Sequence, residues 1–340
     1  MILRRTSCNR IYKDRNISYI CDMKKHFPAL LFLLALAAFP AAAQTAQHIQ
    51  QKLLDIPAGE YSGITRTGDD TYMLVHDKKA SLFVLTLDLA GDGSVGYCGI
   101  FETQEQGKAK RDNEDIVYVP ERKRLFVCAE GDQSIREYRL DGRETGRKLV
   151  IPKDLTSPTG NRGFEALAYA NGTFWATTES PLPGAGMHIL QSFSLKGLQA
   201  RSRYLYQAEA PQVPALKQAS AQAYVSGISA MTVLPDGRLA VLEREVYVPG
   251  GTGALTKLLE SFTETRIFTV SPADGRPGKR LEKTLLTSFR TSALNLANFE
   301  GMCLGPVLQD GRQTLLLIAD SQNGSGGLTG EYLRVIALER

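Results

Sequence analysis

The sequence is poor in the residues that zinc centres and disulfide frameworks need. It has five cysteines and four histidines in 340 residues, and three of the cysteines (Cys98, Cys128 and Cys303) lie after residue 43. Three cysteines cannot pair fully, and their spacings match no zinc motif, which argues against both a disulfide framework and a structural zinc site. We expect Cys128 and Cys303, in apolar strand-like runs, to pack as small apolar side chains.

Familiar catalytic motifs and a strong charge of one sign are also missing. The chain contains no G-x-S-x-G, H-E-x-x-H, P-loop or C-x5-R phosphatase sequence. Residues 1–43 hold seven of the 40 basic and two of the 36 acidic residues, so the rest of the chain is close to neutral. A near-neutral chain gives no electrostatic reason to bind nucleic acid or an anionic membrane surface. The expected partner is a small molecule, and the expected state is a monomer.

Only one long apolar run is present, at residues 29–39. Lys24 and Lys25 precede it, and three alanines before Gln44 follow it, which is the pattern of a secretory signal peptide. The run is too short to span a bilayer comfortably, and a buried core helix is the alternative. We therefore expect a periplasmic or secreted protein with no stable membrane insertion after cleavage. The predicted division is an over-extended start over residues 1–22, a signal peptide over 23–43 and one domain over 44–340.

One sequence unit recurs five times in the remaining chain. Each copy reads as a short strand carrying Ser or Glu and then, as a rule, a small residue, followed by a turn and an apolar strand that ends in an acidic residue. Turn pairs such as Asn171-Gly172 and Asp236-Gly237 separate the two strands. The copies are residues 61–77, 113–130, 164–179, 227–243 and 299–320. Further strand-like runs follow at 81–89, 96–101, 134–141, 148–152, 188–195, 202–207, 265–272, 282–289 and 331–340.

Four strands in each repeated unit predict an all-β fold, a single β-propeller. Five copies favour five blades, with six as the alternative. The last unit lacks one strand, and residues 48–57 are expected to supply it and close the ring, which removes an exposed sheet edge. Residues 215–223 and 253–262 are expected to form short helices in loops.

The residue before each small residue defines a first ring of candidate site residues. The innermost strand of every blade lines the propeller channel, so equivalent side chains are expected to converge on one axis. Converging carboxylates raise one another's pKa unless a cation lies between them, and oxygen ligands suit Ca²⁺ better than Zn²⁺. The alternative is that these are ordinary solvated strand ends. The predicted metal ligands are Ser62, Glu114, Glu165, Ser229 and Glu300.

A second ring is expected where the following strands end in acidic residues. Its predicted members are Asp77, Glu130, Glu179, Glu243 and Asp320, although each could simply hold a turn. His76, Arg162 and Arg244 add a potential base and two groups that could pair with phosphate. Arg162 is the preferred arginine because it lies three residues before Glu165, but it could equally be a salt-bridge partner. The candidate catalytic residues are Glu130, Glu179, Asp320 and Arg162.

Two segments carry a resemblance to a known family. FEALAYANGTFWATTES and FEGMCLGPVLQDGRQTLLLIADS resemble the bacterial "esterase-like activity of phytase" family, and the resemblance covers nearly all of residues 58–340. The order Ser, Glu, Glu, Ser, Glu in the first ring resembles the channel ligands of calcium-activated nucleotidases, which are five-bladed propellers around one Ca²⁺. Other nucleotidase motifs and the Asp-rich calcium sites of true β-propeller phytases are not recognisable, which leaves the substrate open.

The resemblance implies a secreted, calcium-dependent hydrolase of phosphate esters or other esters that acts at the mouth of the channel. In that hypothesis the cation polarises a phosphoryl oxygen and an acidic residue of the second ring acts as base. The alternative is a non-catalytic propeller that binds a ligand or protein and holds a structural Ca²⁺, because propellers host many unrelated functions.

Overall fold

The computed structural model describes residues 45–103, 111–156, 163–322, 324 and 329–339. The predicted start, signal peptide and Arg162 lie outside these residues, so the expectations for them remain predictions. Within the described part of the chain, no helix is long and apolar enough to cross a membrane.

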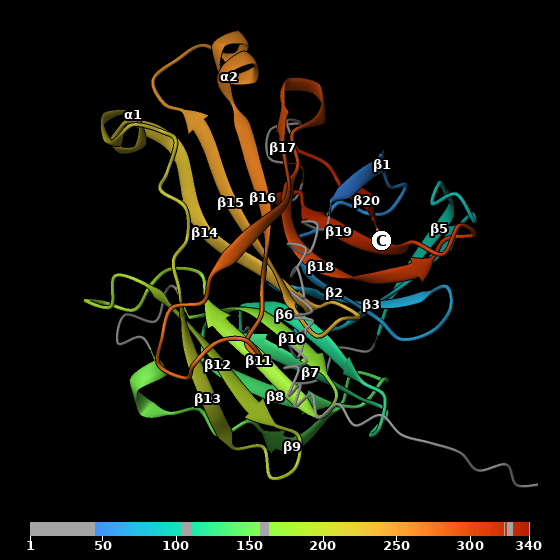
Figure 1. Cartoon of the computed structure of the whole chain (residues 1–340). Coiled ribbons are helices and arrows are strands. Elements are labelled where there is room, and N and C mark those ends of the chain that lie inside the picture. The colour runs from blue at the N-terminus through green and yellow to red at the C-terminus, as the bar shows by residue number, and fades with distance from the viewer. Residues whose placement is uncertain (1–44, 104–110, 157–162, 323, 325–328, 340) are drawn as a thin grey trace, which may run out of the picture. The chain divides into compact units, whose positions relative to one another are not determined.

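The described residues form five antiparallel sheets of four strands each (Figure 1). Blade 1 contains β2 (Tyr61–Arg66), β3 (Thr71–His76), β4 (Phe83–Leu89) and β5 (Val95–Glu102), and blade 2 contains β6 (Asn113–Val119), β7 (Arg124–Ala129), β8 (Ser134–Tyr138) and β9 (Glu144–Lys148). Blade 3 contains β10 (Phe164–Ala170), β11 (Thr173–Thr178), β12 (His188–Ser194) and β13 (Ala200–Tyr206), and blade 4 contains β14 (Ala221–Val233), β15 (Leu239–Pro249), β16 (Phe262–Val270) and β17 (Lys283–Ser292). Blade 5 contains β18 (Asn298–Val307), β19 (Gln313–Asp320), β20 (Tyr332–Leu338) and β1 (Ala46–Leu53), and the short helices are η1 (Lys153–Leu155), α1 (Ala215–Ala219), α2 (Ala254–Glu260) and η2 (Ala293–Asn295).

The innermost strands of the five blades close into a ring. Strands β2, β6, β10, β14 and β18 contact one another in cyclic order, and β18 contacts β2 again. The predicted five-bladed, all-β propeller is therefore confirmed. The predicted fourth strand of blade 2, residues 148–152, is wrong: β9 ends at Lys148, and Leu149 is instead buried in the hydrophobic core between blades 2 and 3.

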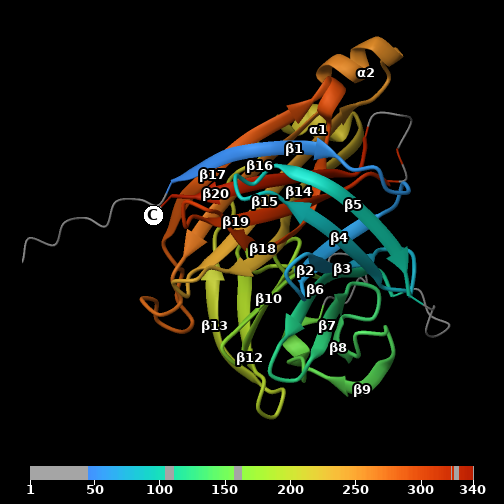
Figure 2. The same ribbon diagram turned by 90° about the vertical axis from the view of Figure 1, so that its right-hand side faces the viewer.

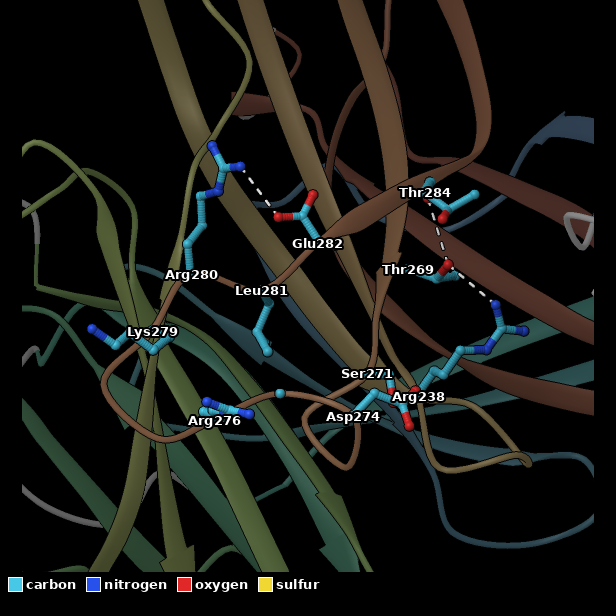
Figure 3. A pocket seen from close by; sticks show the side chains of 11 residues that line it. Arg238, Thr269, Ser271, Asp274, Arg276, Lys279, Arg280, Leu281, Glu282 and Thr284 are labelled. Atoms are coloured by element: carbon cyan, nitrogen blue, oxygen red, sulfur yellow. Dashed lines mark hydrogen bonds and ion pairs between the residues drawn. The ribbon is translucent and has the colours of Figure 1, made fainter. Parts of the chain in front are cut away.

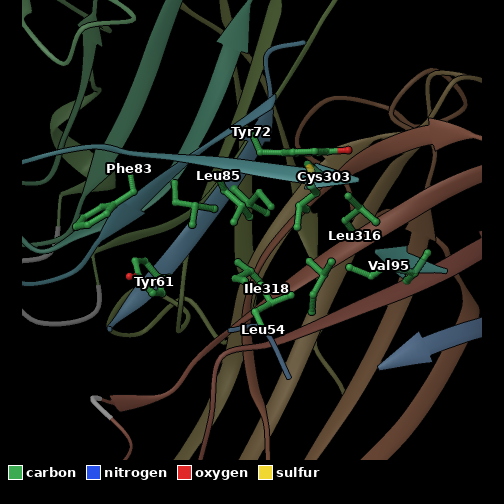
Figure 4. Close-up of a cluster of buried hydrophobic side chains, with 14 residues drawn as sticks. Leu54, Tyr61, Tyr72, Phe83, Leu85, Val95, Cys303, Leu316 and Ile318 are labelled. Atoms are coloured by element: carbon green, nitrogen blue, oxygen red, sulfur yellow. The ribbon is translucent and has the colours of Figure 1, made fainter. Parts of the chain in front are cut away.

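The N-terminal strand completes blade 5, as expected. β1 pairs antiparallel with β20, and Figure 2 shows the two strands side by side. Just after β1, Leu54 packs in a core cluster with Tyr61 and Leu85 of blade 1 and Leu316 of blade 5 (Figure 4). Burial of these apolar side chains stabilises the closed ring at the junction between the first and last parts of the chain.

The small residue of each repeat allows neighbouring inner strands to approach closely. A Cβ atom on Gly63 would lie 2.7 Å from the Asp115 Cα, and one on Gly301 would lie 3.0 Å from the Gly63 Cα. Hydrogen bonds join the blades at this level: Ser62 Oγ donates to the Asn113 carbonyl oxygen at 2.6 Å, and Ser229 Oγ donates to that of Phe299 at 3.1 Å. Backbone contact therefore explains the glycine at this position in blades 1 and 5.

In blade 2 an aspartate takes the place of the small residue. Asp115 is buried, and its carboxylate accepts hydrogen bonds from the Ile116 N–H and from the Leu167 N–H in blade 3, each at 2.8 Å. Burial raises the pKa of Asp115, while these two bonds oppose the rise. Asp115 therefore links blades 2 and 3 through the backbone of β10.

We expect Asp115→Ala to lower the free energy of unfolding by about 2–3 kcal/mol, because it leaves two buried N–H donors without an acceptor. Urea unfolding at neutral pH measures the change. The control is Asp88→Ala, which removes an exposed aspartate from β4 and is expected to have little effect. Equal unfolding midpoints for the two variants would contradict the proposed link.

Blade 4 is longer than the others. β14 begins at Ala221, so the helix expected over residues 215–223 ends at Ala219, while α2 lies within the helix expected over 253–262. Both helices lie at the far end of the long strands of this blade (Figure 1).

Candidate axial site

Every innermost strand has a β-bulge at the first-ring position. The strand register shifts between Tyr61 and Gly63 in blade 1, and at the equivalent point in each other blade. A bulge inserts one extra residue, increases the local twist and redirects a side chain. The residues skipped by the register are those predicted as the first ring: Ser62, Glu114, Glu165, Ser229 and Glu300.

The register of the neighbouring strands defines the second ring. Asn298 pairs with Asp320 in blade 5, and the equivalent pair in blade 4 is Gly227 with Arg244. In the other three blades the residue directly after the last paired position continues this register. The second ring therefore consists of Asp77, Glu130, Glu179, Arg244 and Asp320. An arginine stands in blade 4 where the other four blades have a carboxylate.

The expectation that Glu243 belongs to this ring is wrong. Glu243 accepts hydrogen bonds from the Tyr206 hydroxyl at 2.5 Å, the Glu209 N–H at 2.9 Å and Lys283 Nζ at 2.7 Å. Successive side chains of a strand point to opposite faces, so Glu243 and Arg244 cannot share one direction. β15 continues beyond the ring to Pro249, so its acidic residue does not mark the end of the strand.

Arg244 lies between carboxylates of two non-adjacent blades. Its Nη2 is 3.3 Å from Glu165 Oε1 and 3.1 Å from Glu179 Oε1, both in blade 3. Its Nη1 donates to Glu300 Oε1 and, at 3.0 Å, to Asn298 Oδ1, both in blade 5. The side chain is 6% exposed. Glu165 and Glu300 therefore share one guanidinium, which lies between them.

The sequence did not single out Asn298, and it gave Arg244 only a secondary role. Asn298 Nδ2 also donates to Glu300 Oε1 at 2.8 Å, so this amide orients both the carboxylate and the arginine. Alternate residues of a strand share one face, so in the sequence Glu243-Arg244-Glu245 the arginine faces away from both glutamates. This alternation was the available indication that Arg244, and not Glu243, belongs to the second ring.

Burial raises the pKa of several carboxylates of the two rings. Burial, followed by the charge of Glu165, raises the pKa of Glu114 well above its ordinary value. Burial, followed by Glu179, does the same for Glu165. Burial raises the pKa of Asp320 to about 6, although Gln322 donates two hydrogen bonds to its carboxylate. The electrostatic environment therefore favours additional positive charge at this level of the channel.

The remaining candidates, Asp77, Glu130 and His76, each contact nearby residues. Asp77 pairs with Lys78, while its Oδ1 is buried and has no hydrogen-bond partner among the described residues. Glu130 Oε1 accepts from the Gly163 N–H at 2.8 Å. His76 packs against Tyr61, and burial lowers its pKa to about 4, which keeps the imidazole neutral and a weak base.

The donor chemistry of the first ring fits a hard divalent cation. The two rings hold three and four carboxylates against one arginine. The Ser62 and Ser229 hydroxyls each donate one hydrogen bond and keep oxygen lone pairs for a cation. In the described residues, no three His, Cys, Asp or Glu side chains are already close enough to hold a metal ion. The guanidinium of Arg244 lies against two of the five predicted ligands.

Two hollows of the described structure contain none of the ring residues. One, of about 230 Å³, lies in the channel and is lined by residues of all five inner strands, including Ile64, Ile116, Leu167, Met231 and Met302. Another, of about 460 Å³, lies along β16 and β17, where Arg238 donates to Thr269 and Arg280 pairs with Glu282 (Figure 3). The acidic rings are therefore distinct from both.

Comparison with known proteins identifies a related family. The family model "Phytase-like: Esterase-like activity of phytase" matches residues 56–322. No curated protein matches the chain. Similar solved structures include the Dos1 propeller (7% identity, 82% of this chain and 68% of that chain, TM-score 0.36) and streptogramin B lyase (12%, 87% and 98%, TM-score 0.36). A nidogen/laminin complex is also similar (12%, 82% and 89%, TM-score 0.38). The blade count follows from the sheet order and not from these structures.

Proposed function

Because the chain belongs to the phytase-like family with esterase-like activity, we propose that it is a calcium-dependent hydrolase of phosphate esters or related esters. The family supports an ester- or phosphoester-hydrolysing activity in general. The calcium requirement, the reaction site at the channel mouth and export by the predicted leader are our proposals.

The observation that carries this proposal is the excess of carboxylates around Arg244. Glu165, Glu300 and Glu179 all contact this one guanidinium, and burial raises the pKa of neighbouring Glu114. A divalent cation held by the five first-ring residues would balance this charge with oxygen ligands. When bound, Ca²⁺ would supply a Lewis acid for a phosphoryl oxygen.

In this proposal carboxylates of the second ring move protons, and an arginine binds the substrate. Glu179 is 17% exposed at its side chain, so it can accept a proton from an attacking water while remaining positioned by Arg244. Asp320, with a pKa of about 6, can exchange a proton near neutral pH. Glu130 is a further candidate base, and Arg162, outside the described residues, remains a proposed phosphate-binding group.

We expect hydrolysis of p-nitrophenyl phosphate to require calcium and to stop in EDTA. Glu300→Gln should lower kcat/KM on the order of 100-fold, because it removes a ligand charge that positions the electrophilic cation. The control is Glu282→Gln, whose side chain is 88% exposed, and its rate should equal that of the wild type. p-Nitrophenyl acetate, measured in parallel, distinguishes phosphate esters from carboxylic esters.

Hydrolysis that continues unchanged in EDTA would contradict the calcium requirement. Calcium binding without hydrolysis of either ester would favour the alternative of a non-catalytic binding propeller with a structural cation.

A further inference from the structure

Arg244 combines a second-ring backbone position with contacts to the first ring. The other four blades have an acidic residue at the second-ring position. An acidic side chain has no positive charge with which to take the place of a cation. The Arg244 guanidinium instead lies between Glu165 and Glu300, two of the predicted ligands. A divalent cation bound by the same carboxylate oxygens would therefore need the space that this guanidinium occupies.

We propose that Arg244 is a displaceable internal counter-ion of the first ring. Its guanidinium contacts Glu165 and Glu300, and a bound cation would take over these two carboxylates while the guanidinium keeps its contacts with Glu179 and Asn298. This inference rests on the proposed cation site, and it adds a residue that sets the affinity of that site.

Two positive groups cannot share these buried carboxylates without strong repulsion. Glu165 and Glu300 are 6% and 7% exposed, so water screens their surroundings poorly. A cation that approaches either oxygen must therefore repel the guanidinium, and the free energy needed to move Arg244 is subtracted from the free energy of cation binding.

Alternative partners for the guanidinium are already in contact with it. Glu179 lies 3.1 Å from Nη2 and Asn298 Oδ1 lies 3.0 Å from Nη1, so contact with both can continue after Glu165 and Glu300 are released. The Arg244 Nε is buried and has no hydrogen-bond partner in the described part of the protein. The present position therefore leaves one donor unsatisfied, which lowers the cost of leaving it.

Displacement would also present Arg244 to a substrate. The Glu179 side chain is more exposed than those of Glu165 and Glu300, so release from these two buried carboxylates would let the guanidinium shift towards the more exposed oxygen and an anionic group. Cation binding and anion binding would then favour each other, since linkage between two sites is reciprocal.

The test measures calcium affinity by calorimetric titration with CaCl₂, and thermal unfolding in EDTA and in calcium. Arg244→Gln should bind calcium 10- to 100-fold more tightly than the wild type, on the order of typical coupling between sites. Its melting temperature should fall in EDTA, because three carboxylates lose their counter-ion, and recover in calcium. The control, Arg290→Gln, removes an arginine of the same blade whose side chain is 47% exposed, and should change neither quantity.

Arg244→Lys distinguishes the effect of displacing the side chain from the effect of removing its charge. It also provides the measurement if Arg244→Gln does not fold in EDTA. Lysine keeps the charge but lacks the planar fork that contacts both blades, so its calcium affinity should exceed that of the wild type. Affinities equal to or below that of the wild type in both variants would overturn the displacement. Absence of calcium binding in every protein, the wild type included, would instead overturn the cation site itself.

Discussion

A chain that begins at Asp55 is expected to lose the stable propeller, whereas one that begins at Gln44 should retain it. The shorter chain lacks β1, which pairs with β20 through seven residue pairs. Its loss exposes the backbone edge of β20 and leaves the last blade with three strands. We expect either no cooperative unfolding or a loss of more than about 5 kcal/mol, a large part of the stability of an ordinary domain.

The expected loss is large because β1 connects blade 5 to both of its neighbours. Gln50 Oε1 accepts from the Val95 N–H at 2.8 Å, and Lys52 Nζ donates to the Val95 and Gly96 carbonyl oxygens in blade 1. On the other side, a hydrogen bond of 2.8 Å joins His48 Nε2 to Thr287 Oγ1 in blade 4. The strand therefore contributes more than its own pairing.

Urea unfolding followed by circular dichroism measures this loss. A synthetic peptide of residues 44–54, added to the shorter chain, should restore cooperative unfolding by strand addition. If both chains unfold at the same urea concentration, β1 is dispensable and the ring is held closed by other contacts.

Glu165→Gln is expected to weaken calcium binding far more than Glu179→Gln. Glu165 belongs to the first ring and would supply a ligand charge, so its loss should lower affinity on the order of 100-fold. Glu179 belongs to the second ring and contacts Arg244, so its loss acts indirectly and should cost about 10-fold or less.

The two substitutions are matched, since each removes one carboxylate that contacts Nη2 of the same arginine. Calorimetric titration measures the affinities, and melting temperatures in EDTA show whether each variant folds without calcium. The wild type should also melt at a lower temperature in EDTA than in calcium, because a ligand bound only by the native state stabilises it. Equal affinities of the two variants would show that the first ring does not hold the cation.

The repeat alone determined most of the architecture. Five copies of the unit and the missing last strand predicted five blades and an N-terminal closing strand, because these are properties of consecutive residues. The sequence also shows Ser or Glu before the marker position in every copy of the unit. The cause of this pattern, a bulge beside a close backbone contact at residues such as Gly63 and Gly301, appears only when neighbouring blades are in place.

The tertiary structure alone decided which charges meet. Glu243, next to Arg244 in the sequence, points to the opposite face of β15 and binds Tyr206 and Lys283. Arg244 reaches Glu165, 79 residues away, and Glu300, 56 residues away, across the channel. A local pattern gives the order of residues along one strand. Strand register and the length of a side chain that crosses between blades determine which carboxylates share a guanidinium, and both are fixed only by packing of the whole ring.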